Sequence, residues 1–267
     1  MKKYDALHPP LLARIISEER AKHGEKAKAD KSAKTRLHQL YGAYSQPHTY
    51  KKASAILDTW ESAPGVTIDA SAAAELMRLH TSTRERLPFY TQFYRFILEH
   101  IPQPASVLDL GCGFNPFALP ILMEQLHADS PLQDYHAFDI CKRQMSLINR
   151  FFALSGLPQQ AACADLVAQS QQSASPLPAA DVAFLFKLLP VLEAQANGSG
   201  FALVRNLQAK RVIITYPTKS LTGKEKGMTQ HYRQSIETAL AEGRLAPFTK
   251  QAEAIIGNEQ IYILTGK

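Results

Sequence analysis

The segment Val107-Leu108-Asp109-Leu110-Gly111-Cys112-Gly113 decides the fold class of this 267-residue chain. Its first residues have the apolar character of a short buried strand, and two glycines follow at once. Glycine has no Cβ, so it permits a sharp turn and lets a ligand come close to the backbone. A strand that runs into such a turn is typical of the ligand-binding edge of an open α/β sheet.

The chain around and beyond this segment alternates between strand-like and helical stretches. Runs of β-branched, aromatic and other apolar residues predict further strands at residues 135–140, 161–165, 181–186, 211–217 and 260–264. Helices are predicted between them, notably at residues 144–154 and 194–207. This alternation indicates an α/β fold with a mainly parallel sheet that helices cover on both faces.

The first part of the chain has the periodicity of helices instead. Leu11, Leu12, Ile15 and Ile16 form an apolar stripe, which predicts a first helix. A basic link at 22–34, a short helix at 35–44 and a helix at 70–79 follow. A further amphipathic stretch begins near Ser82, where a capping-box pattern occurs, and Pro88 predicts a kink or a later helix start. We therefore expect a helical domain at residues 1–79 and a Rossmann-like domain at residues 80–267.

Nearly all of the excess positive charge lies in the N-terminal fifth of the chain. Residues 1–52 hold 12 Lys and Arg against 5 Asp and Glu, a balance of +7, whereas residues 53–267 have a balance of −1. Clustered Lys and Arg attract a polyanion such as RNA, although a solvated, charge-rich helical surface explains the balance equally well. The sequence has no apolar run long enough to span a membrane and three widely spaced cysteines, so we expect a cytoplasmic protein.

The glycine turn and the acids near it point to the cofactor. Asn115-Pro116 replaces the third glycine of a dinucleotide-binding turn, and Asp109 would repel a phosphate but could pair with an ammonium group. S-adenosylmethionine has an ammonium group and no phosphate, so it fits better than a dinucleotide. Asp139 and Asp165 end the next two predicted strands, where they could bind ribose hydroxyls and lie beside an adenine amino group. Taken singly, each of these two acids could equally be a helix N-cap.

The methyl acceptor is less clear from the residues alone. The usual motif for methylating an exocyclic amine and the Pro-Cys nucleophile of cytosine methylation are both missing. Lys187 follows the strand at 181–186 and would lie near the transferable methyl group, and a basic loop at 219–227 follows the next strand. Guanine N7 has a free lone pair, so its methylation needs alignment rather than a general base. We assign no metal site, because the histidines and cysteines show no metal-ligand spacing.

Six segments, in the same order along the chain, resemble the Arm/Rmt family of 16S rRNA guanine-N7 methyltransferases that confer aminoglycoside resistance. They are residues 36–44, 80–87, 107–116, 186–190, 216–221 with 226–228, and 256–262. This chain departs from the commoner family pattern at Gly111, where many members have Ala. The resemblance implies a Rossmann-like class I S-adenosylmethionine-dependent methyltransferase with an all-helical N-terminal domain that docks on 16S rRNA in the 30S subunit.

The resemblance also implies a reaction and a set of site residues. The reaction is methylation of N7 of guanine 1405, and the expected cofactor-binding residues are Tyr44, His80, Thr81, Ser82, Arg86, Gly111, Asp139, Asp165, Leu166, Phe186 and Gln195. Arg86 would bind the cofactor carboxylate. Residues expected to position the target guanine or its phosphates are Lys187, Lys219 and Glu259. Two alternatives stay open at this point: a methyltransferase for another RNA or a small molecule, and a non-catalytic RNA-binding protein.

Overall fold

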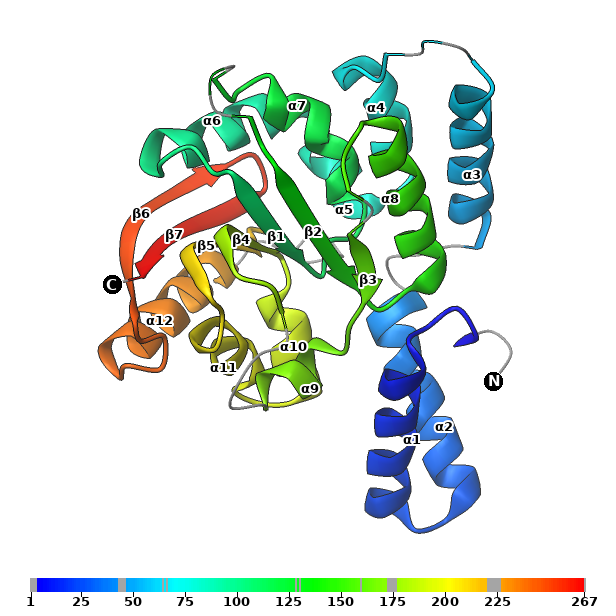
Figure 1. Cartoon of the computed structure of the whole chain (residues 1–267). Coiled ribbons are helices and arrows are strands. Elements are labelled where there is room, and N and C mark those ends of the chain that lie inside the picture. Colours follow the sequence, from blue (N-terminus) through cyan, green and yellow to red (C-terminus); the bar gives the residue numbers. More distant parts are fainter. Residues whose placement is uncertain are drawn as a thin grey trace.

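The computed structural model describes residues 4–42, 47–63, 65, 67–127, 129, 131–158, 160–171, 177–219 and 227–266. Its centre is a seven-stranded sheet with the order β3-β2-β1-β4-β5-β7-β6 (Figure 1). The strands are β1 (Ser106–Leu110), β2 (Asp134–Asp139), β3 (Ala161–Cys163), β4 (Ala180–Phe186), β5 (Ala209–Pro217), β6 (Phe248–Ile256) and β7 (Glu259–Gly266). Strands β1 to β5 pair in parallel, and β7 pairs antiparallel with both β5 and β6. The predicted mainly parallel sheet is confirmed.

Helices cover both faces of this sheet. One face carries α3 (Pro47–Glu61), α4 (Ala70–Met77), α6 (Tyr90–His100), α7 (Leu119–Met123) and α8 (Lys142–Leu154). The other face carries α9 (Leu166–Ser170), α10 (Leu189–Gln195), α11 (Ser199–Arg205) and α12 (Met228–Ala241). Successive side chains of a strand point to opposite faces, so Val107 belongs to the first core and Leu108 to the second.

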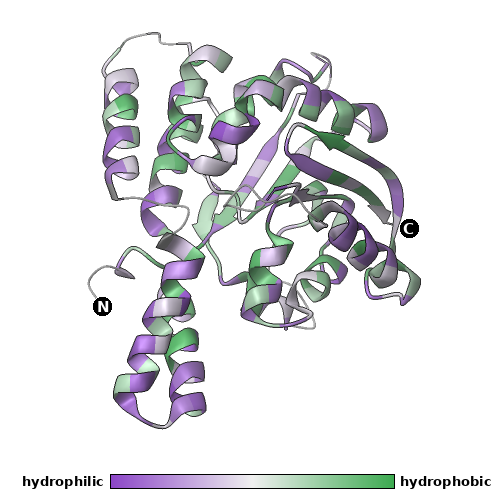
Figure 2. Cartoon of the chain, turned by 180° about the vertical axis from the view of Figure 1, so that it is seen from behind, coloured by the Kyte–Doolittle hydropathy of each residue, from purple (hydrophilic) through white to green (hydrophobic). Residues whose placement is uncertain are grey.

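The first two helices form a hairpin that projects from the sheet near β3 (Figure 1). They are α1 (Pro9–His23) and α2 (Lys26–Leu37), and a π-helical turn (His38–Gly42) follows. Leu11, Ile15 and Leu37 form a small core between them. The outward surface of the hairpin is largely hydrophilic (Figure 2). Among the described residues, no helix has both the length and the apolar composition needed to cross a membrane.

Some element predictions were wrong. The expected basic link at 22–34 is mostly the helix α2, because Ala and Lys favour helix and Ala29 and Ala33 pack inward. The expected helix at 194–207 is the end of α10 and the whole of α11, because Ala196 takes an extended conformation with a φ of −151° and Gly198, with a positive φ of 78°, begins α11. Helix α3 and strand β6 were not anticipated. The predicted break at Pro88 is confirmed, because a short 3-10 turn (Leu87–Phe89) separates α5 (Thr81–Arg86) from α6.

Candidate active site

A pocket lies at the carboxyl ends of β1, β2 and β4, where the strand order changes direction between β1 and β4. Ligands of open α/β sheets bind at this switch point. Of the residues expected to bind the cofactor, those that line the pocket are His80, Ser82, Arg86, Gly111, Asp139, Asp165, Leu166, Phe186 and Gln195. Thr81, the first residue of α5, is not among the described lining residues, and Tyr44 lies outside the described part of the chain.

The glycine turn after β1 forms one wall of this pocket. Gly111 and Gly113 have φ angles of 61° and 52°, in the left-handed region that favours glycine. A Cβ at position 111 would come within 2.6 Å of Leu188 Cδ1. The amide of Gly113 donates to Asp139 Oδ2 at 2.9 Å. The turn is therefore tight, and the acid at the end of β2 holds it in place.

Asp139 keeps hydrogen-bonding capacity for a ligand. Besides the Gly113 amide, it accepts from the amide of Ile140 at 2.6 Å. Removal from bulk water raises the pKa of Asp139, and these two amide donors oppose the shift. A carboxylate can accept about four hydrogen bonds, so two amides leave room for the two hydroxyls of a ribose.

Asp109 does not have the role that the sequence analysis gave it. Its carboxylate is fully buried and accepts from the Tyr135 hydroxyl at 2.7 Å and from Asn115 Nδ2 at 2.8 Å. Burial raises the pKa of Asp109 to about 6. Asp109 alternates with Leu108 and Leu110 in β1, so it points to the face that α6 covers and away from the pocket. The expected pairing with an ammonium group is therefore wrong.

His80 presents an imidazole to the pocket. It stacks on Phe114 with 5.3 Å between ring centroids, and it is 5% exposed. Burial lowers the pKa of His80 to about 4, helped by the nearby charge of Arg86, so the ring is neutral at pH 7. Its buried Nδ1 atom has no hydrogen-bond partner among the described residues. An unsatisfied polar atom in a pocket wall is a position that a polar ligand group can satisfy.

Arg86, the last residue of α5, also lines the pocket and forms a buried ion pair with Glu259 of β7. Arg86 Nε and Nη2 donate to the two carboxylate oxygens of Glu259 at 2.9 and 3.0 Å. Arg86 Nη1 donates to the Tyr90 hydroxyl and to Asn115 Oδ1, both at 3.1 Å. Glu259 is 1% exposed and is not among the described lining residues, so it lies behind Arg86 rather than at the pocket surface.

Lys187 connects this buried pair to the pocket. Its φ of 56° is the one positive φ recorded for a non-glycine residue in the described ranges. Its Nζ lies 3.0 Å from Glu85 Oε2 and 3.3 Å from Glu259 Oε1. Burial disfavours the Glu259 carboxylate, but Arg86 and Lys187 outweigh that effect and lower its pKa. A strained backbone at a pocket wall is a common feature of functional sites.

Lys219 is not among the described residues that line the pocket. It is exposed and follows β5, and residues 220–226 of the expected basic loop are outside the described part of the chain. In the described ranges, no group of three or more His, Cys, Asp or Glu side chains could hold a metal ion.

The far end of the pocket contains residues that the sequence analysis missed. Asp165 caps α9 by accepting from the amides of Val167 and Ala168, and it also binds Arg14 of α1. The hairpin also contributes Leu11, Leu40 and Tyr41 to the pocket lining. The apolar stripe that holds Leu11 was used only to predict a helix, and no local motif links residue 14 to residue 165.

Comparisons with known proteins agree with this geometry. A family model described as "Ribosomal RNA methyltransferase (FmrO)" matches residues 1–263. A relative from Frankia casuarinae, named 16S rRNA (guanine(1405)-N(7))-methyltransferase, is 37% identical, and the alignment covers 98% of this chain and 89% of the relative. A protein of the same name from Serratia marcescens is 33% identical, with 98% and 93% covered.

Solved structures that are similar to this chain are also 16S rRNA methyltransferases. The 16S rRNA methyltransferase RmtF, crystallised with S-adenosyl-L-homocysteine, has a TM-score of 0.81 and 29% identity, covering 99% of this chain and 93% of its own. The 16S rRNA methylase RmtB has a TM-score of 0.78 and 30% identity, covering 100% of this chain and 94% of its own.

Proposed function

The chain belongs to the FmrO family of ribosomal RNA methyltransferases, and from that premise we propose that it methylates N7 of guanine 1405 in 16S rRNA. The observation that carries this proposal is full-length similarity to enzymes of that name, combined with a pocket at the switch point of the sheet. Such a methyl group gives aminoglycoside resistance, because it alters the base in the decoding site that the drug contacts. The assembled 30S subunit is the proposed substrate, which places the reaction in the cytoplasm.

The pocket fits S-adenosylmethionine by the chemistry of its lining. Asp139 offers acceptors for ribose hydroxyls, and Leu166 offers a buried apolar contact for a purine ring beside Asp165. The unsatisfied Nδ1 of His80 and the hydroxyl of Ser82 line the same pocket near α5, where the polar amino-acid end would lie. When bound, S-adenosylmethionine supplies a methyl group on a sulfonium, and transfer to N7 breaks the S–C bond with its electron pair left on sulfur.

For this transfer the protein has to align the guanine N7 with the methyl group, and it needs no general base. The N7 lone pair is free, so no proton has to be removed from the target. Lys187 is held at the pocket wall by Glu85 and Glu259, from which its ammonium group can reach the guanine or a flanking phosphate. Glu259 is buried, so it acts on the target only through Lys187 and Arg86, which it holds in place.

We assign binding of rRNA to residues 1–79, and chiefly to the hairpin. Its outward side carries five exposed lysines, at positions Lys22, Lys26, Lys28, Lys31 and Lys34. Phosphate groups bind such clusters by releasing counterions, which makes the affinity strongly dependent on salt. Lys219, exposed at the end of β5, would add a contact near the target nucleotide.

The test is methyl transfer from labelled S-adenosylmethionine to purified 30S subunits, with naked 16S rRNA and small-molecule acceptors assayed beside them. The proposal expects label in the 16S rRNA of the 30S subunit. Label in another acceptor and none in 30S subunits would contradict it.

A further inference from the structure

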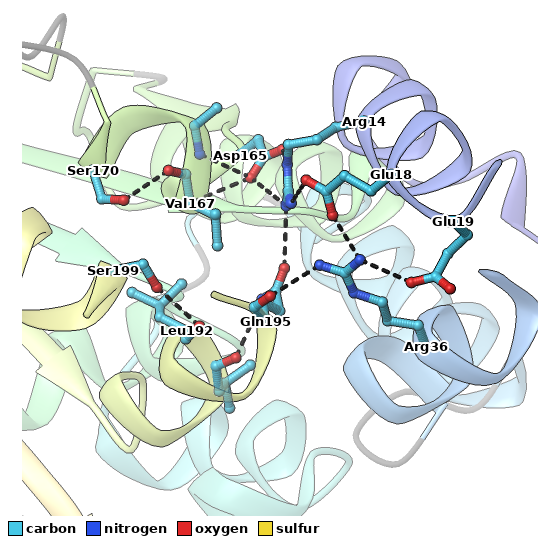
Figure 3. Close-up of polar contacts among 12 residues, drawn as sticks. Arg14, Glu18, Glu19, Arg36, Asp165, Val167, Ser170, Leu192, Gln195 and Ser199 are labelled. Atoms are coloured by element: carbon cyan, nitrogen blue, oxygen red, sulfur yellow. Dashed lines mark hydrogen bonds and ion pairs between the residues drawn. The ribbon is translucent and has the colours of Figure 1, made fainter. Parts of the chain in front are cut away.

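The N-terminal hairpin contributes an ion-pair network to the edge of the cofactor pocket (Figure 3). Arg14 of α1 donates from Nε to Asp165 Oδ2 at 2.6 Å and from Nη2 to Asp165 Oδ1 at 3.0 Å. The same Nη2 donates to Gln195 Oε1 at 3.2 Å. One guanidinium therefore holds two pocket residues, Asp165 and Gln195, which lie 151 and 181 positions away from it in the sequence.

A second arginine reinforces this arrangement. Arg36 of α2 donates to the Gln195 carbonyl oxygen at 3.0 Å and to Glu18 at 2.6 Å. Glu18 also accepts from Arg14 Nη1 at 2.9 Å, so one carboxylate joins the two arginines. The fork of Arg14 is thereby fixed before any ligand arrives, which reduces the entropy lost when the pocket is filled.

The residues just before α1 are hydrogen-bonded to the segment that follows β2. The amide of His8 donates to the Ile140 carbonyl at 2.8 Å, and the amide of Lys142 donates to the Ala6 carbonyl at 2.7 Å. Ile140 is the residue after Asp139, which holds the glycine turn. The hairpin is thus attached beside both acids of the pocket, Asp139 and Asp165.

We propose that Arg14 is a positioning residue for the adenine end of the cofactor pocket, so that the pocket is complete only with the hairpin in place. The inference rests on the proposed function in that it takes the ligand to be S-adenosylmethionine. Asp165 is 5% exposed, and Arg14 is its counter-ion. Without Arg14 this carboxylate would be buried with no positive partner in the described contacts, and the Gln195 side chain would lose the donor that fixes its amide oxygen.

The experiment measures binding of S-adenosyl-L-homocysteine to the free, full-length protein by calorimetry, with no ribosome present. Arg14→Ala is expected to weaken binding on the order of tenfold, since it removes charge-assisted hydrogen bonds. Arg14→Lys should recover little of the loss, because one ammonium group cannot bind both carboxylate oxygens and Gln195. The matched control is Arg20→Ala, which removes the same charge from an exposed position of the same helix.

A double-mutant cycle separates positioning through Asp165 from a general effect on stability. Asp165→Asn can still cap α9, because Asn is a good N-cap residue. We expect Arg14→Ala to weaken binding less in the Asp165→Asn background than in the wild type, because only its contact with Gln195 is left to lose, whereas losses from unconnected sites would add. Unchanged or tighter binding by Arg14→Ala, full recovery by Arg14→Lys, or additive losses would overturn the inference. A wild-type protein that binds the ligand but leaves 30S subunits unmethylated would contradict the proposed function instead.

Discussion

At the scale of single residues, His80 is an imidazole that the fold keeps neutral. The unfolded chain binds more protons than the folded one between about pH 6.5 and 4, because burial lowers the folded-state pKa of His80 to about 4. The contribution of His80 to stability is therefore full above pH 6.5 and is lost as the pH falls through that window. At pH 5 the loss amounts to about 2 kcal/mol.

This pH dependence can be isolated with a substitution that cannot titrate. We expect the difference in unfolding free energy between wild type and His80→Gln to shrink by about 2 kcal/mol from pH 7 to pH 5, as measured by urea denaturation. The control is His48→Gln, since His48 is exposed on α3. A difference that stays constant with pH would show that His80 is not held neutral.

Asp109 shows why a residue's role can be missed in the sequence. Its position next to the glycine turn suggested a ligand contact. Side chains alternate along β1, however, so that of Asp109 lies on the opposite face of the sheet from those of Leu108 and Leu110. There it binds Tyr135 and Asn115, which come from 26 and 6 positions further along the chain. The burial pattern of the strand was visible in the sequence, whereas these partners depend on the tertiary packing.

At the scale of elements, β7 is tied to α5 by the buried pair of Glu259 and Arg86. Removing one charge of a buried pair leaves the other without compensation, which costs about 3 kcal/mol or more. We expect Glu259→Gln to lower the free energy of unfolding by about that amount, measured by chemical denaturation. Glu242→Gln serves as the control, because its partner Arg244 is 44% exposed and such surface pairs contribute about 1 kcal/mol or less. Equal effects of the two substitutions would contradict the structural role given to Glu259.

The parallel strands were predictable because each is a short apolar run bounded by turns or helices. Strand β6 was not predictable, since its exposed and buried residues do not alternate clearly. It is an edge strand that pairs only with β7. α2 was taken for a link because it has few large apolar residues, yet Ala29, Ala33 and Leu37 are buried and pack it on α1. The acids at the ends of β2 and β3 were found from their order along the chain, but the network of Arg14 joins residues with no local signal.

At the scale of the whole molecule, we propose that one hairpin takes part both in rRNA docking, through its exposed lysines, and in cofactor binding, through Arg14. Deleting residues 1–52 would remove Leu11 from the pocket lining and Arg14 from Asp165, as well as the basic surface, so a deletion cannot separate the two roles. Substitution of exposed lysines can separate the two roles, because it leaves Leu11 and Arg14 in place. We expect the pair Lys28→Glu and Lys31→Glu to weaken 30S binding at least about tenfold and to reduce its salt dependence, with affinity for S-adenosyl-L-homocysteine unchanged.

The control for this experiment is Arg95→Glu, which makes the same change of charge as one of the two lysine substitutions, at an exposed site on α6, across the sheet from the hairpin (Figure 1). Filter binding of 30S subunits at several salt concentrations gives the affinity and its slope. Equal loss from Arg95→Glu would mean that net charge, and not the hairpin surface, governs docking.

The central claim is tested most directly by locating the methyl group. Purified protein is incubated with 30S subunits and S-adenosylmethionine, and the 16S rRNA is treated with borohydride and aniline, which cleave the chain at 7-methylguanine. Primer extension should then show one new stop that depends on the enzyme, one nucleotide to the 3′ side of guanine 1405. A stop at another nucleotide, or label in the rRNA without any scission, would contradict the assignment of both the base and the atom.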